Sequence, residues 1–205
     1  MKKDLLLFGT SVTIFTLLLI DALTVFLTKS IDLSILSILN STWSSSSTTI
    51  ASHITDLSGE TAVVGFTVII LVILLLRRKW ELVFFHISAM VGSLFLFSFL
   101  KALTARERPL SKISEVAQLS FPSGHATMSL TMAAVIYILL KDKLSPPLQK
   151  IFLWLCILFP VMISFTRIYL NVHYPSDVIA GMSLGVIWMS ILFKIYFKNE
   201  EIIQA

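Results

Sequence analysis

The chain has 205 residues, of which 56% are hydrophobic and only 14% are charged. A soluble domain usually carries about 25% charged residues, so this composition excludes an ordinary soluble protein and indicates an integral membrane protein. At this length we expect one compact bundle, a single membrane-embedded domain over residues 1–205. The only cysteine, Cys156, excludes a disulfide within the chain.

Apolar segments along the chain predict an all-α fold, an integral membrane bundle of six transmembrane helices. The segments span about 5–27, 61–76, 82–103, 125–140, 151–170 and 177–197. The second and fourth are short for a hydrocarbon core of about 30 Å, so we expect both to continue into the polar residues at their outer ends. The first could belong to a signal peptide, but it is membrane-length and no small-residue cleavage site ends it, so we interpret it as a retained helix.

The distribution of Lys and Arg predicts the orientation of this bundle. Ten of the sixteen basic residues fall on one side, and they are Lys2, Lys3, Arg77, Arg78, Lys79, Lys141, Lys143, Lys150, Lys194 and Lys198. We therefore expect a protein of the cytoplasmic (inner) membrane with both termini in the cytoplasm. Segments 28–60, 101–124 and 171–176 then face outward, toward the periplasm in a bacterium with two membranes.

The first outer loop, 28–60, is rich in Ser and Thr but carries apolar residues at helical spacing between Ile31 and Trp43. This pattern predicts a short amphipathic helix on the membrane surface, and a second short helix near 49–57. The loop is either a solvated connector or a lid beside an outer site, and the sequence leaves both interpretations open.

Polar residues that could take part in catalysis lie between the last two apolar segments. His173 precedes Asp177 by four residues, and Pro175-Ser176 between them is typical of a helix start. That spacing would let the carboxylate hold one imidazole nitrogen while the other acts as a base or a nucleophile. Charged groups at the end of a membrane helix are costly unless they are wet or paired, which makes this pair a candidate functional site.

An anion site is predicted near the same outer ends. Lys101 and Arg108 follow the third apolar segment, and Arg167 ends the fifth. The stretch Pro122-Ser123-Gly124-His125 precedes the fourth segment, where Ser123 is a plausible N-cap and Gly124 lets a ligand approach the backbone. The amides of Gly124 and His125 would then face a phosphate at a helix N-terminus. For Arg106 and Lys112, a solvated surface position is favoured over attraction of an anionic headgroup.

Several other polar residues receive structural interpretations. His86 is interpreted as a packed core residue, His53 as exposed and Glu107 and Glu115 as solvated. Asp21, in the outer third of the first segment, would pair with a site cation or reach the interface. Gly181 and Gly185 predict close helix packing in the sixth segment.

Taken together, Lys101 with Arg108-Pro109, Pro122 to His125, and Arg167 with His173 and Asp177 resemble the three-part signature of the type-2 phosphatidic acid phosphatase superfamily. Six residues separate Lys101 from Arg108, five separate Arg167 from His173, and three separate His173 from Asp177. One departure is Thr166, where the family usually has Ser; the hydroxyl is kept, so we expect little change.

The resemblance implies a role for each matched residue. His173 would be the nucleophile that forms a phosphohistidine, Asp177 would orient it, and His125 would be the general acid and base. The phosphoryl oxygens would be held by Lys101, Arg108, Ser123, Gly124 and Arg167. No outer carboxylate cluster is present to hold a metal, so we expect activity without a metal or other cofactor.

The implied activity is hydrolysis of a membrane lipid phosphate or pyrophosphate, with the lipid arriving from the bilayer and no nucleic acid partner. Phosphatidylglycerol phosphate and undecaprenyl pyrophosphate rank first as substrates, with phosphatidate also in the class, and lipid A 1-dephosphorylation is the alternative. Vanadium haloperoxidases share the same residues, but they are soluble. A non-catalytic lipid-binding or translocating relative is disfavoured because the residue set is intact.

Overall fold

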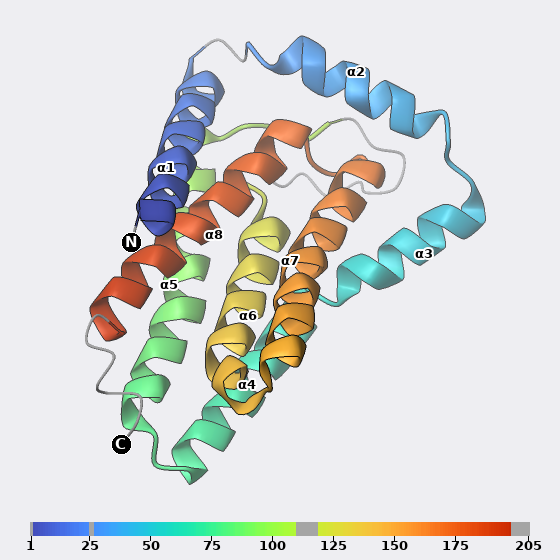
Figure 1. Cartoon of the computed structure of the whole chain (residues 1–205). Coiled ribbons are helices and arrows are strands. Elements are labelled where there is room, and N and C mark those ends of the chain that lie inside the picture. The colour runs from blue at the N-terminus through green and yellow to red at the C-terminus, as the bar shows by residue number, and fades with distance from the viewer. Residues whose placement is uncertain (1, 25–26, 110–118, 198–205) are drawn as a thin grey trace.

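The computed structural model describes residues 2–24, 27–109 and 119–197, and over this part of the chain the protein is helical (Figure 1). The helices are α1 (Lys2–Leu23), α2 (Lys29–Asn40), α3 (Ser45–Asp56), α4 (Glu60–Leu76), α5 (Trp80–Thr104), α6 (Gly124–Leu140), the short 3-10 helix η1 (Lys141–Lys143), α7 (Pro146–Tyr169) and α8 (Pro175–Tyr196). Six stretches are long and apolar enough to cross a membrane. The predicted fold class is therefore confirmed.

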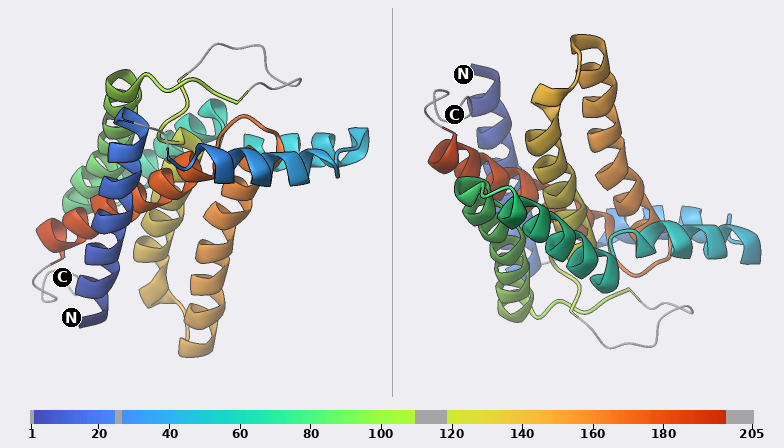
Figure 2. Two further views of the ribbon diagram at one scale, coloured as in Figure 1. Left: turned by 90° about the horizontal axis from the view of Figure 1, so that it is seen from above. Right: turned by 90° about the horizontal axis from the view of Figure 1, so that it is seen from below.

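The bundle is organised around α6, which packs against α5, α7 and α8 (Figures 1 and 2). α1 packs mainly on α8, and α4 packs on α5. The approach of α8 to α6 depends on the two predicted glycines, since a Cβ on Gly181 would lie 2.5 Å from the Ser123 carbonyl oxygen. A Cβ on Gly185 would lie 3.0 Å from the Leu130 side chain. Small residues at these positions allow the two helix backbones to come close, as the sequence predicted.

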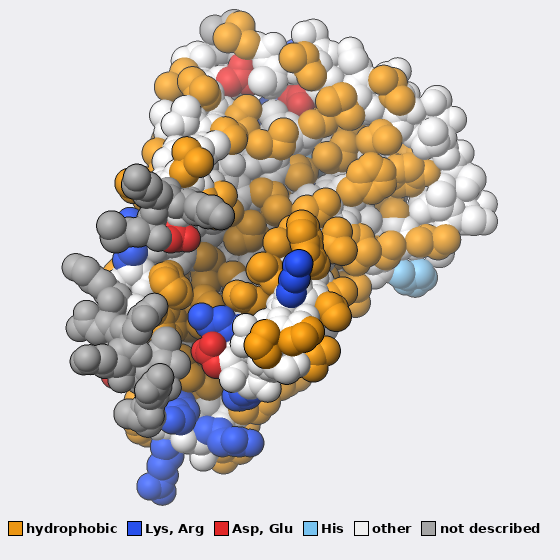
Figure 3. All heavy atoms as spheres, viewed as in Figure 1, with side chains coloured by type: hydrophobic (Ala, Val, Ile, Leu, Met, Phe, Trp, Pro, Cys, Tyr) orange, Lys and Arg blue, Asp and Glu red, His pale blue; other side chains and the backbone are white. Residues whose placement is uncertain are grey.

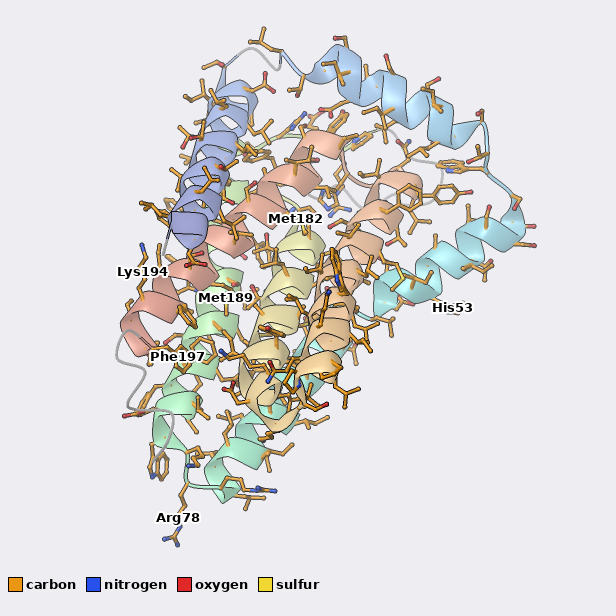
Figure 4. The ribbon with its side chains drawn as sticks, in the orientation of Figure 1. His53, Arg78, Met182, Met189, Lys194 and Phe197 are labelled. Carbon is orange, nitrogen blue, oxygen red and sulfur yellow. The ribbon has the colours of Figure 1, made fainter. Side chains whose placement is uncertain are left out.

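The two ends of the bundle differ in chemistry. One end, which we call the basic end, includes the α4–α5 turn at 77–79 and η1, and Lys and Arg side chains gather there (Figure 3). Arg78 lies at its tip, and Lys194 on α8 lies next to α1, with its Nζ 4.9 Å from the centre of the Phe8 ring (Figure 4). The opposite end, which we call the site end, is formed by segments 105–109, 119–123 and 170–174.

Apolar side chains fill the half of the bundle nearer the basic end. A buried cluster from α5, α6 and α8 comprises Phe85, Ala89, Val135, Met189, Leu192 and Phe197 (Figure 4). His86 is fully buried near these residues, with its Nε2 3.0 Å from the Thr67 carbonyl oxygen. The interpretation of His86 as a packed core residue is therefore confirmed.

Both helices predicted in segment 28–60 are present, and α2 crosses the site end of the bundle (Figure 1). Ser44 caps α3 through a reciprocal pair of hydrogen bonds with Ser47. α3 leads into α4 through residues 57–59, and the two helices form a continuous 32-residue candidate span, Ser45–Leu76, whose apolar part is α4. The second predicted segment thus continues outward, as expected. The same expectation for the fourth segment is wrong, because α6 begins at Gly124 and the span continues instead through η1 to Lys143 at the basic end. α3 also contacts α7, which brings segment 28–60 against the end of the bundle.

The predicted outer boundary of the first segment is wrong, because α1 ends at Leu23 rather than near residue 27. Asp21 is buried and accepts hydrogen bonds from the Thr28 backbone N–H at 3.2 Å and from the Thr28 hydroxyl at 2.8 Å. These bonds tie the end of α1 to the start of α2. Asp21 therefore pairs with Thr28, and its predicted pairing with a site cation is not found.

Candidate active site

The residues of the three predicted motifs converge at the site end. Lys101 lies in the last turn of α5, Ser123, Gly124 and His125 lie at the start of α6, and Arg167 lies in the last turn of α7. Arg108 follows α5, His173 lies between α7 and α8, and Asp177 lies in the first turn of α8. Residues more than seventy positions apart in the sequence thus meet where four helices begin or end.

His173 and Asp177 form a buried pair. The His173 side chain is 1% exposed and that of Asp177 is fully buried, with Nδ1 of the imidazole 3.4 Å from Oδ2 of the carboxylate. This distance is long for a hydrogen bond, and Nδ1 has no hydrogen-bond partner among the described residues. The carboxylate also accepts hydrogen bonds from the Ser120 hydroxyl and, at 2.9 Å, from the Tyr174 backbone N–H. These two bonds fix the position of the Asp177 carboxylate beside the His173 ring.

The local backbone explains why His173 faces Asp177. α7 ends at Tyr169, whose carbonyl oxygen accepts a hydrogen bond of 2.7 Å from the Trp43 indole. Asn171 then adopts a left-handed conformation with φ of 55°, which reverses the chain direction and is tolerated by Asn better than by most residues. Pro175 starts α8 at its first position, where a missing N–H costs nothing. The loop is therefore fixed at both ends.

The start of α6 lies directly beside the start of α8. The Ser123 backbone N–H donates to the Asp177 carbonyl oxygen at 3.0 Å. Ser123 is the N-cap by position, but its hydroxyl makes no capping bond, and this buried oxygen has no hydrogen-bond partner among the described residues. The first amides of α6, including those of Gly124 and His125, are free of partners within their own helix. A Cβ on Gly124 would lie 3.0 Å from the Phe97 ring, so Gly124 also permits a tight packing contact.

Three cations lie around this helix start, and we call Lys101, Arg108 and Arg167 together with Ser123 and Gly124 the cradle. The Lys101 ammonium donates to the Leu119 carbonyl oxygen. Arg167 is buried and donates to the Thr55 hydroxyl of α3 at 3.0 Å. Burial lowers the pKa of the Arg108 guanidinium from its ordinary value, while the charge of Asp177 acts in the opposite direction.

The cations act directly on His173. Burial lowers the pKa of the His173 imidazole well below its ordinary value of 6.5, and the three cradle cations lower it further. His173 is therefore neutral at pH 7, which leaves a ring nitrogen able to act as a nucleophile. His125 is partly buried at the edge of α6 and interacts electrostatically with His173 and with all three cations. Two histidines and three cations thus share one site.

Arg106 differs from the prediction. A solvated surface position was expected, but the Arg106 side chain is 7% exposed and forms ion pairs with Asp177 at 2.8 Å and with Asp32 at 3.1 Å. The physical reason is that α2 and α8 each bring a buried carboxylate to the same place. The sequence pattern did not single out Asp32, although it is an acidic residue in a predicted surface helix with few charges. Contact between α2 and α8 is decided only in the folded chain.

Other predictions about single residues can be compared with the structure. His53 on α3 is exposed and points away from the bundle (Figure 4), and Glu107 is exposed, as expected. The Thr166 hydroxyl donates to the Ile163 carbonyl oxygen of its own helix at 2.7 Å. Lys112 and Glu115 lie outside the described residues. Within the described ranges, no group of three or more His, Cys, Asp or Glu side chains is placed to hold a metal ion.

Comparison with known proteins identifies the family. The family model described as "PAP2 superfamily" matches residues 82–201, more than half of the chain, so the protein belongs to the PAP2 superfamily. An undecaprenyl-diphosphatase from Sulfolobus acidocaldarius is 40% identical over 74 residues, which are 36% of this chain and 31% of that protein. A lipid A 4′-phosphatase from Bacteroides thetaiotaomicron is 29% identical over 136 residues, which are 57% of this chain and 56% of that protein. The chain thus spans between about a third and just over half of these relatives' lengths.

A solved structure shares the whole fold. The transmembrane PAP2-type phosphatidylglycerolphosphate phosphatase from Bacillus subtilis has a TM-score of 0.79 with this chain at 23% sequence identity. The match covers 97% of this chain and 98% of that one. The helical bundle is therefore shared with that solved structure over nearly its whole length.

Proposed function

We propose that the protein is a lipid phosphate phosphatase, which hydrolyses phosphate from a membrane lipid phosphate or diphosphate. The observation that carries this proposal is the buried His173–Asp177 pair with three cations acting on its imidazole. Fixed positive charge beside a neutral nucleophile suits phosphoryl transfer, in which positioning and charge stabilisation supply most of the catalysis. The names of the related proteins, which include a diphosphatase and two lipid phosphatases, support the same substrate class.

In the first step, a ring nitrogen of His173 attacks phosphorus as the bond from phosphorus to the lipid oxygen breaks. Nδ1 faces Asp177, so Nε2 is the attacking atom. The new bond is a phosphohistidine, whose positive ring charge the Asp177 carboxylate stabilises. His125 donates a proton to the leaving oxygen, which departs as the lipid alcohol, or as the lipid monophosphate when the substrate is a diphosphate.

In the second step, water attacks the phosphohistidine and the bond from phosphorus to nitrogen breaks. His125, now neutral, accepts the proton of this water, and inorganic phosphate leaves. The electron pair of the broken bond returns to His173, which is again neutral. The same residue serves as acid and then as base, so the two steps restore the enzyme to its starting state.

The cradle holds the transferring phosphoryl group throughout. Lys101, Arg108 and Arg167 offset its negative charge, and the Ser123 hydroxyl and Gly124 amide donate hydrogen bonds to its oxygens. The Ser123 hydroxyl supports this role because it is buried without a hydrogen-bond partner in the described part of the chain. Three fixed cations would serve where kinases use magnesium, so we expect activity that does not depend on a metal.

The site would face the outer side of the cytoplasmic membrane, with both termini in the cytoplasm. The distribution of Lys and Arg between the two ends supports this orientation. A site at the ends of membrane helices lies level with lipid headgroups, so a lipid can react while its tail stays in the bilayer. Among possible substrates, phosphatidylglycerol phosphate and undecaprenyl pyrophosphate rank first, followed by lipid A carrying a 1-phosphate.

The test is phosphate release by the purified full chain in detergent from phosphatidylglycerol phosphate, undecaprenyl pyrophosphate, phosphatidate and lipid A. We expect release from at least one of the first two, preserved in EDTA and inhibited by vanadate, which mimics the phosphoryl group in transit. Activity that EDTA abolishes and Mg²⁺ restores would contradict metal independence. No release from any of the four lipids would overturn the proposed function.

A further inference from the structure

Arg106 is enclosed by groups from three parts of the chain. Its guanidinium donates through one nitrogen to the Asp177 carboxylate at 2.8 Å and to the Ser176 hydroxyl at 3.0 Å. Through the other terminal nitrogen it donates to the Asp32 carboxylate at 3.1 Å. The Tyr174 ring covers one face, with the guanidinium carbon 4.6 Å from the ring centre. We call Arg106, Asp32, Ser176 and Asp177 the Arg106 cluster.

Asp32 also binds the first turn of α8 directly. One of its oxygens accepts a hydrogen bond from the Ser176 backbone N–H at 3.0 Å, and the other accepts one from the Ser176 hydroxyl at 2.5 Å. A carboxylate at a helix N-terminus is favourable, since it meets unpaired N–H groups and the positive end of the helix dipole. Asp32 of α2 thus holds the same helical turn that presents Asp177 to His173.

The charges of the Arg106 cluster do not cancel. Asp32 and Asp177 are buried with one guanidinium between them, so one formal negative charge remains within this cluster. If Asp32 were neutral, Arg106 would offset the charge of Asp177 alone. The imidazole becomes positive when it is phosphorylated, and charge interactions are strong in a buried setting, so the second carboxylate favours the intermediate.

We propose that Asp32 and Arg106 are positioning residues that hold Asp177 in place and leave its negative charge available to His173 during phosphoryl transfer. This inference rests on the proposed phosphatase function. It makes α2, from the first outer loop, a part of the active site rather than a connector. The bonds described above run from Asp32 and Arg106 to Ser176 and Asp177 of α8. We therefore expect both residues to affect the reaction step more than phosphate binding.

The experiment compares Asp32→Asn with Asp21→Asn in the purified full chain. Both carboxylates are buried and both bond Thr28, but only Asp32 contacts Arg106. Asp32→Asn should lower kcat by about 10- to 100-fold, because it removes an interaction that matters mainly when the imidazole is charged. KM for the lipid and the inhibition constant of inorganic phosphate should change by less than about twofold, because the cradle is intact. Asp21→Asn should retain wild-type kcat.

Equal kcat values for the two variants would overturn the positioning role, and so would a raised KM at unchanged kcat. If Asp32→Asn does not fold, Asp32→Glu and Arg106→Lys keep every charge and alter only the geometry. Both should lower kcat at unchanged KM, and wild-type kcat in both would also overturn the role. A wild-type chain that releases no phosphate contradicts the proposed function itself, so the two failures are distinguishable.

Discussion

The cradle and the Arg106 cluster are neighbouring regions of the site end, and they place an arginine in opposite electrostatic environments. Arg108 and Arg106 are two positions apart in the sequence. Arg108 joins Lys101 and Arg167 in a concentration of positive charge around His173, whereas Arg106 lies between two buried carboxylates. The difference indicates two uses of a cation at one site. Arg106 fixes acidic side chains, whereas Arg108 is proposed to bind an anionic substrate.

The largest effect is expected where the two regions meet. His173→Ala should lower phosphate release by about 1,000-fold or more, because the change removes the proposed nucleophile that both regions surround. Rates are measured on the lipid that the wild-type chain hydrolyses best. His53→Ala is the matched control, since His53 is exposed on α3 away from the site. Near-normal phosphate release by His173→Ala would contradict the phosphohistidine mechanism.

A cradle variant should behave differently from a variant of the Arg106 cluster. Lys101→Ala should lower kcat/KM by about 100-fold, since it removes a fixed charge that faces the phosphoryl group. Inhibition by inorganic phosphate should weaken at the same time, because the cradle is proposed to bind phosphate, which does not react there. The measurement is the phosphate inhibition constant beside kcat and KM. Unchanged phosphate inhibition in Lys101→Ala would place Lys101 outside the binding site.

The relative placement of the two regions depends on Gly181. A Cβ there would lie 2.5 Å from the Ser123 carbonyl oxygen, which is rigid backbone, so Gly181→Ala should displace the start of α6 from α8. We expect a loss of activity of about tenfold and a lower melting temperature, in line with the roughly 1–3 kcal/mol typical of overpacking. Gly185→Ala is the matched control, since its Cβ meets the flexible Leu130 side chain. Equal effects of the two changes would contradict this explanation.

The pH dependence of the reaction reports how strongly the cradle cations lower the pKa of His173. Burial and the cradle cations lower the pKa of His173 below 6.5, so its neutral form persists as the pH falls through that value. The acidic limb of kcat/KM assigned to His173 should therefore lie below pH 6.5. Lys101→Ala removes one of these cations and should move the limb upward. A limb at or above pH 6.5 in the wild-type chain would contradict the described charge environment.

The smallest effect is expected at Thr166, which lies next to the cradle. Its hydroxyl bonds the Ile163 carbonyl oxygen within α7, and Ser can make the same bond. Thr166→Ser should therefore change kcat and KM by less than about twofold. Phosphate-release kinetics check this prediction. A larger change would mean that the extra methyl group of Thr166 affects the position of Arg167.

Much of the fold could be predicted from periodicity and composition. The six membrane segments, the two helices of segment 28–60 and the close packing at Gly181 and Gly185 follow from local patterns, and the structure contains them. The predicted end of α1 is wrong because hydrophobicity continues past Leu23, whereas the helix ends there and Thr28 bonds back to Asp21. Such a boundary depends on a side chain that caps the next element, which an apolar pattern does not reveal.

The candidate site likewise has one part that the sequence predicted and one part that it did not. By itself, the sequence predicted which residues would carry the chemistry, because the spacings from Lys101 to Arg108 and from Arg167 to Asp177 are short and lie at helix ends. Only the tertiary structure decided what Arg106 does. Its environment is made by Asp32 of α2 and Asp177 of α8, which are 145 positions apart and meet only when those helices pack. The sequence of a charged side chain is the same whether it faces water or pairs with a buried carboxylate. Its partner is therefore known only from the tertiary structure.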